Sequence, residues 1–117
     1  MKINRSVLQN LCALSKEFHP REVGGILLGR NVINDFVMMP GKFSYGEVLV
    51  NMYDVPIYPN MAGTFHSHPT PDARPSRADL SFFSRWGRIH LIIGAPYDLN
   101  SVKAYDPQGK PVDVVIE

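Results

Sequence analysis

The sequence predicts an α+β (mixed α/β) domain built on a central sheet, and three observations support this. Two segments carry apolar residues at helical spacing, which predicts two helices. About six shorter apolar or alternating segments, bounded by glycine and proline, predict strands. The order of these elements is not a regular βαβ alternation. At 117 residues the chain has a common domain size, and we expect one domain over residues 1–117.

The first elements are a helix and a buried strand. Residues 4–20 read NRSVLQNLCALSKEFHP, and Pro20 stops the predicted helix. Its apolar face follows helical spacing through Val7, Leu8, Leu11, Leu14, Ser15 and Phe18. Residues 22–29, EVGGILLG, form a short apolar run bounded by glycine, which favours a buried strand.

The remaining elements are mostly strands around one further helix. We expect strands at residues 31–40, around Glu47–Asn51, and at residues 61–68, with a loop at Pro56 and Pro59 between the last two. Residues 76–87 predict a helix that Gly87 ends, with an apolar stripe of Ala78, Phe82, Phe83 and Trp86. Strands at 88–95, 101–106 and 110–117 complete the chain, the last two joined by a turn at 107–109.

Composition narrows the class of protein. Hydrophobic residues make up 44% and charged residues 20%, as in soluble globular domains. A net charge of +1 gives no reason to expect a nucleic-acid partner. The single cysteine, Cys12, excludes an intramolecular disulfide and a cysteine-rich zinc site. No apolar run has the length of a signal peptide core or a membrane span, so we expect a cytoplasmic protein without a membrane partner.

Two of the four histidines, His66 and His68, stand one residue apart at the end of a predicted strand. Residues two apart on a strand face the same side, so the two imidazoles project together. A catalytic zinc site takes three protein ligands and leaves one position open. Asp72, in the following loop, and Asp79, in the first turn of the next helix, are the candidates for the third. We favour Asp79, because a helix holds its carboxylate rigidly.

Each of these residues also has a plainer interpretation. Ser76 and Asp79 fit a capping box at a helix start, and an isolated His-x-His pair is more often polar surface than a ligand pair. Glu22 opens an otherwise apolar strand, where a carboxylate has no packing purpose, and it is a candidate general base. Alternatively, it is a solvated linker residue.

Other polar residues favour structural roles. His90 lies in an apolar strand and is expected on a sheet face or in the core. Four arginines cluster around the predicted site, and a solvated surface is favoured over attraction of an acidic substrate protein. These are Arg74, Arg77, Arg85 and Arg88.

Taken together, Glu22, the run HSHP at residues 66–69, and Ser76 with Asp79 resemble the JAMM motif of the MPN+ metalloproteases. The resemblance covers nearly the whole chain and is closest to the small stand-alone archaeal JAMM-like proteases. It implies a single MPN/JAMM-like domain with a mostly antiparallel sheet flanked by helices. It further implies Zn²⁺ as cofactor, held by His66, His68 and Asp79. Glu22 would be the general acid/base, and Ser76 the donor to the developing oxyanion.

The family also implies a substrate class. We expect a zinc metallo-isopeptidase or peptidase that cuts after the C-terminal Gly-Gly of a ubiquitin-like modifier, a deubiquitinase-like or desampylase-like activity. The expected partners are ubiquitin-like modifiers and their conjugates. The chain has no room for the second insertion with which eukaryotic members select a linkage. Two alternatives stay open: a peptidase that matures a ubiquitin-like sulfur carrier, and a zinc-stabilised interaction module without turnover.

Overall fold

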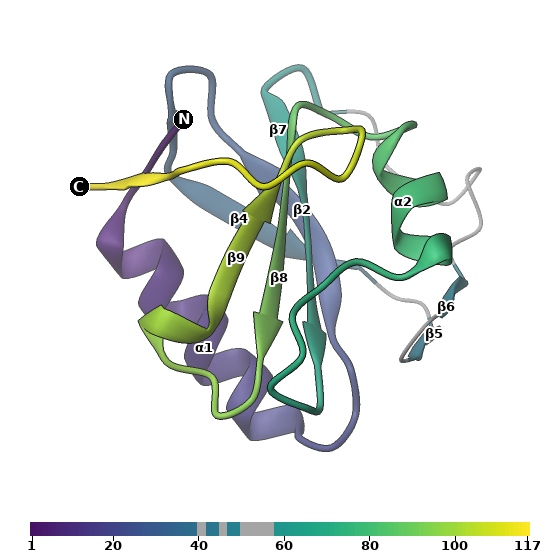
Figure 1. The fold of residues 1–117 in the computed structure, drawn as a ribbon. Coiled ribbons are helices and arrows are strands. Elements are labelled where there is room, and N and C mark those ends of the chain that lie inside the picture. The colour runs from purple at the N-terminus through teal and green to yellow at the C-terminus, as the bar shows by residue number, and fades with distance from the viewer. Residues whose placement is uncertain (40–41, 45–46, 50–57) are drawn as a thin grey trace.

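The computed structural model describes residues 1–39, 42–44, 47–49 and 58–117. Its main feature is a five-stranded sheet in the order β4-β2-β7-β8-β9 (Figure 1). The strands are β4 (Asp35–Met38), β2 (Gly24–Leu28), β7 (Met61–His68), β8 (Ile89–Gly94) and β9 (Val102–Tyr105). Neighbours run antiparallel except for the parallel pair β7 and β8. The mixed fold with a mostly antiparallel sheet is therefore confirmed.

Two smaller sheets lie beside it. Three short strands pair in parallel in the order β10-β1-β3, which brings the two chain ends together (Figure 1). They are β10 (Val115–Ile116), β1 (Lys2–Ile3) and β3 (Val32–Ile33). The third sheet is an antiparallel pair, β5 (Lys42–Ser44) and β6 (Glu47–Leu49). The predicted strand at Glu47–Asn51 is described only as far as Leu49, and residues 50–57 lie outside the described part of the chain.

The two helices pack on opposite faces of the central sheet. Helix α1 (Arg5–Phe18) buries Leu11 and its neighbours with Phe65 and Leu91 in the larger core. Helix α2 (Arg77–Phe83) buries Phe83 with Ile92 on the other face. A short 3-10 helix, η2 (Leu99–Ser101), precedes β9. No helix in the described ranges combines the length and apolar character that crossing a bilayer requires.

Strand alternation decides what each face carries. Phe65 on β7 belongs to the core under α1, so Thr64, His66 and His68 face the α2 side. Nearly all of β7 is buried because it is a central strand with neighbours on both edges. The two histidines therefore enter a covered interior between the sheet and α2.

The structure corrects several predicted boundaries. The segment 31–40 forms two strands, because Asn34 donates its backbone N–H to Leu28 and turns the chain from one sheet to the other. The segment 110–117 contributes only the two residues of β10, and β1 was not predicted, because strands this short carry no periodicity. The helix at 76–87 ends at Phe83. Gly87 has φ +78°, and a Cβ there would lie 2.5 Å from the Gly63 Cα, so this turn requires glycine.

Candidate metal centre

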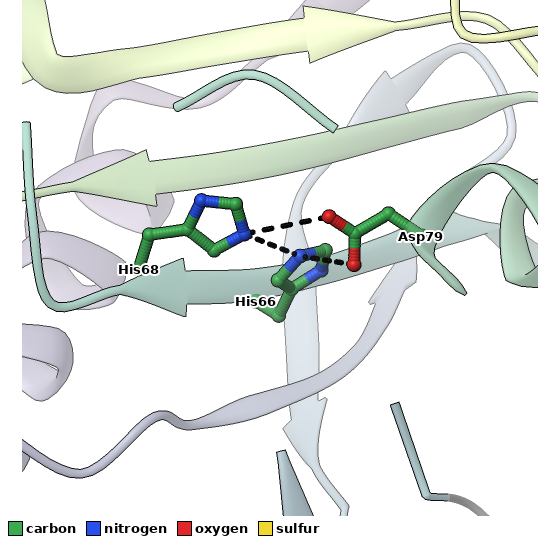
Figure 2. Close-up of side chains that lie close together, drawn as sticks. All are labelled: His66, His68 and Asp79. Atoms are coloured by element: carbon green, nitrogen blue, oxygen red, sulfur yellow. Dashed lines mark hydrogen bonds and ion pairs between the residues drawn. The ribbon is translucent and has the colours of Figure 1, made fainter. Parts of the chain in front are cut away.

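Strand β7 presents His66 and His68 on one face, as their spacing predicts (Figure 2). Their Nε2 atoms lie 3.1 Å apart, and both residues are at most 2% exposed. An Nε2 pair this close in a buried space is either an N–H···N hydrogen bond or two lone pairs that face one cation. The third group that meets them helps to decide between the two.

Helix α2 supplies that group as the buried carboxylate of Asp79 (Figure 2). Its Oδ1 lies 3.0 Å from His66 Nε2, and its Oδ2 lies 3.4 Å from His68 Nε2. The capping box is also present: the Asp79 N–H donates to Ser76 Oγ at 3.1 Å, and the Ser76 N–H donates to Asp79 Oδ2 at 2.8 Å. The two interpretations of Asp79 are thus compatible, because the cap orients the same carboxylate that faces the histidines.

This donor set fits a zinc ion. The ligand atoms of His66, His68 and Asp79 all lie within 4.8 Å of one another. Zinc–ligand distances of about 2.0–2.1 Å imply a tetrahedron edge of roughly 3.3 Å. The 3.0 Å between Asp79 Oδ1 and His66 Nε2 and the 3.1 Å between the two Nε2 atoms are close to that edge. Nitrogen and carboxylate oxygen ligands without sulfur suit a catalytic zinc site.

The electrostatics of the cluster favour positive charge. Burial alone would raise the pKa of the Asp79 carboxyl, but hydrogen bonds from His66 and His68 outweigh it and hold this pKa well below its usual range. Burial alone would lower the pKa of His68, yet the hydrogen bond to Asp79 leads the effects that raise it. The cluster therefore stabilises a cation, which is either a proton or a metal ion in its place.

Asp72, the other candidate, contributes through its backbone. Its carbonyl oxygen accepts the Nδ1 hydrogen of His68 at 2.8 Å, which leaves Nε2 facing the cluster. Both oxygens of its carboxylate accept hydrogen bonds from the Arg74 guanidinium at 2.9 Å. The side chain of Asp72 is thus engaged by Arg74, while its main chain fixes the tautomer of His68.

Glu22 stands in the loop that joins α1 to β2. Burial raises the pKa of its carboxyl to about 7, the charge of His68 lowers it, and the charge of Asp79 raises it. Its Oε1 is buried and has no hydrogen-bond partner among the described residues. Glu22 also lines a hollow of about 190 Å³ with Phe18, Arg21 and Met39 among its walls. A half-buried carboxylate with a pKa near neutrality, beside a cation site, suits proton transfer.

Ser67 binds the residue after Glu22, Val23, to the strand that carries the two histidines, a role that the sequence pattern did not reveal. The Val23 N–H donates to Ser67 Oγ at 3.0 Å, and the Ser67 N–H donates to the Val23 carbonyl at 2.9 Å. The only signal in the sequence was the place of Ser67 between two histidines, on the opposite face of the strand.

His90 and Arg88 make their hydrogen bonds outside the cluster. His90 is fully buried on the sheet face, as predicted, with its Nδ1 2.7 Å from Thr64 Oγ1. Arg88 is exposed and donates to the Arg30 carbonyl at 3.2 Å.

Comparisons with known proteins show the family to which this chain belongs. A family model described as prokaryotic homologs of the JAB domain matches residues 4–106. A probable metalloprotease of Haloferax volcanii is 36% identical over 113 residues, covering 86% of this chain and 69% of that protein.

Two solved structures share the fold. A JAB1/MPN domain protein of Archaeoglobus fulgidus is 36% identical with a TM-score of 0.80, over 99% of this chain and 98% of that one. A second structure, described as a metalloprotease-like zinc site in the proteasome and signalosome, is 34% identical with a TM-score of 0.78, over 100% and 97% of the two chains.

Proposed function

Because this chain belongs to the family of prokaryotic homologs of the JAB domain, we propose that it is a zinc-dependent peptidase or isopeptidase. One observation carries the proposal: a buried cluster of His66, His68 and Asp79 has the Glu22 carboxyl, with its pKa near 7, beside it. A purely structural zinc site needs no proton acceptor at its edge. The sequence relationship to a probable metalloprotease supports the same chemistry.

Each residue has a defined part in amide hydrolysis. His66, His68 and Asp79 would hold the zinc ion. When bound, zinc acts as a Lewis acid and lowers the pKa of water toward about 7. Glu22 accepts a proton from the attacking water as the water oxygen bonds to the carbonyl carbon. It then donates this proton to the leaving amine as the C–N bond breaks, so that its own charge is restored. The Ser76 hydroxyl donates a hydrogen bond to the carbonyl oxygen as negative charge develops there.

The substrate that we propose is a ubiquitin-like modifier, cut after its C-terminal Gly-Gly. The ligand cluster is buried between the sheet and α2, so the scissile bond must reach it through a narrow approach. Glycine passes such an approach because it has no side chain. Strand β6 contacts α2 (Figure 1), so an extended tail that adds to the edge of β6 would run toward Asp79.

The decisive experiment uses a ubiquitin-like protein joined through its Gly-Gly tail to a reporter, either linearly or through a lysine side chain. We expect cleavage after the second glycine, inhibition by a chelator, and loss of cleavage when that glycine is replaced by valine. Changing the attached protein should alter the rate little. Strict dependence on the attached protein would favour a maturation peptidase, and zinc binding without any cleavage would favour an interaction module.

A further inference from the structure

The loop that carries Glu22 is fastened at both of its ends. On the side of β2, Val23 and Ser67 exchange two hydrogen bonds. On the side of α1, the His19 Nδ1 lies 2.5 Å from the Tyr97 hydroxyl, and the two rings meet edge to face with centroids 5.5 Å apart. Glu22 therefore lies in a short segment between two hydrogen-bonded residues, His19 and Val23.

Tyr97 is itself held in an unusual backbone conformation. Its φ is +66°, which is rare for a bulky side chain and costs free energy. Its N–H donates to the Gly94 carbonyl at 2.9 Å, and its side chain is 5% exposed. Gly94 ends β8 at the position that pairs with His68. The position of Tyr97 is thus fixed by the end of β8, next to His68 on the paired strand β7.

We propose that Tyr97 is a positioning residue, which holds the Glu22 loop at a fixed distance from the metal ligands through its hydrogen bond to His19. The expected effect on catalysis rests on the proposed function, whereas the expected effect on the loop does not. Ser67 lies on β7 between the two histidines of the cluster, and Tyr97 follows β8, the strand that pairs with β7 at this point. Glu22 is also close enough for its charge to raise the pKa of Tyr97, after burial, which is the larger cause.

The test compares Tyr97→Phe, His19→Phe and the double variant, all loaded with zinc. Each single change removes one partner of the hydrogen bond and keeps an aromatic ring in place. We expect each to lower kcat by about 10- to 100-fold with KM little changed, because misplacing a catalytic group affects the chemical step. The double variant should be no worse than either single variant, since the two residues act as a unit. Excess zinc should not restore the rate.

A second readout does not depend on turnover. The Arg21 N–H donates to the Phe18 carbonyl and the Val23 N–H to Ser67 Oγ, so hydrogen exchange at these two amides reports on the loop. We expect faster exchange at both in Tyr97→Phe. The matched control is Tyr105→Phe, which removes a buried hydroxyl that donates to the Ala73 carbonyl at 2.6 Å. Tyr105→Phe should leave the exchange rates of these two amides unchanged. Any effect of Tyr105→Phe on kcat should be additive with that of His19→Phe, unlike the effect of Tyr97→Phe.

The two proposals fail in different ways. Wild-type protein that cleaves no Gly-Gly fusion overturns the proposed function, and the exchange measurement still decides the role of Tyr97. Unchanged exchange at Arg21 and Val23 in Tyr97→Phe overturns the positioning role. So does full recovery of the rate on adding zinc, because the loss would then lie in metal affinity.

Discussion

The Phe83 ring stacks on the His90 imidazole, with centroids 4.3 Å apart and planes inclined by 9°. Phe83 is the last residue of α2 and also lies 6.2 Å from the His66 ring. One aromatic side chain thus stacks on the buried His90 and also contacts the His66 ring of the cluster. His66 and His90 contact the same aromatic ring but have different polar partners. His66 meets the Asp79 carboxylate, whereas His90 meets the Thr64 hydroxyl.

Stability should fall in acid through His90. Burial lowers the pKa of its imidazole to about 4, and the charge of His66 acts in the same direction. In the unfolded chain the His90 imidazole is protonated below about pH 6.5, whereas in the folded protein it is protonated only below about pH 4. Lowering the pH through this range therefore reduces the free energy of unfolding by up to roughly 3 kcal/mol. Urea denaturation at pH 7.5 and pH 4.5 measures the free energy of unfolding of metal-free wild type and His90→Gln. Between these two pH values the wild type should lose more of this free energy than the variant. A pH-independent difference between them would contradict this.

Metal binding should distinguish the two aspartates. Asp79→Asn should weaken zinc binding sharply, because the proposed function makes the buried carboxylate a ligand that supplies the compensating charge. Asp72→Asn should keep close to one zinc per chain, since its contribution is a backbone carbonyl that the substitution preserves. Metal analysis after dialysis measures both, with His68→Ala as a further loss variant. Equal zinc content in the two asparagine variants would show that Asp79 is not a ligand.

Glu22→Gln should fold, bind zinc and lose most of its turnover. Glutamine keeps the shape of the side chain but cannot accept a proton, so we expect a loss of at least about 100-fold in kcat. Single-turnover kinetics with a Gly-Gly fusion, together with zinc content, check this. Near-wild-type turnover in this variant would exclude Glu22 as the proton acceptor.

Ser76 has two separable roles, as oxyanion donor and as helix cap. Ser76→Ala should lower turnover by about 10²–10³-fold and also remove a cap worth about 1 kcal/mol. Ser76→Gly removes the same hydroxyl but costs the cap only a few tenths of a kcal/mol. Equal loss of turnover in the two variants, with different melting temperatures, supports the donor role. A rate that follows stability instead would assign Ser76 to the cap alone.

Ser67→Ala should destabilise the fold without removing a ligand. It leaves the Val23 N–H without its side-chain partner, which costs about 1–3 kcal/mol for a buried donor. Ser67→Thr keeps the hydroxyl and serves as the control. Chemical denaturation measures the free energy of unfolding, and an alanine variant as stable as wild type would show that this bond is dispensable.

The sequence by itself determined the fold class and the candidate residues. Period-2 spacing is a local property of a strand, so the shared face of His66 and His68 could be predicted without any neighbour. The capping pattern of Ser76 and Asp79 is local in the same way. Strands as short as β1 and β10 could not be predicted, since two residues carry no period and their pairing depends on residues more than a hundred positions away.

Only the tertiary structure decided which groups meet. Nothing in the spacing of Asp72 reveals that its carbonyl, rather than its carboxylate, serves His68. The pKa of Glu22 depends on burial and on the charges of His68 and Asp79, which lie far from it in sequence. The contact between His19 and Tyr97 spans 78 positions. Such relationships are set by how strands β2, β7 and β8 pair. That pairing cannot be read from any one segment, because it depends on many weak contacts between residues far apart in the sequence.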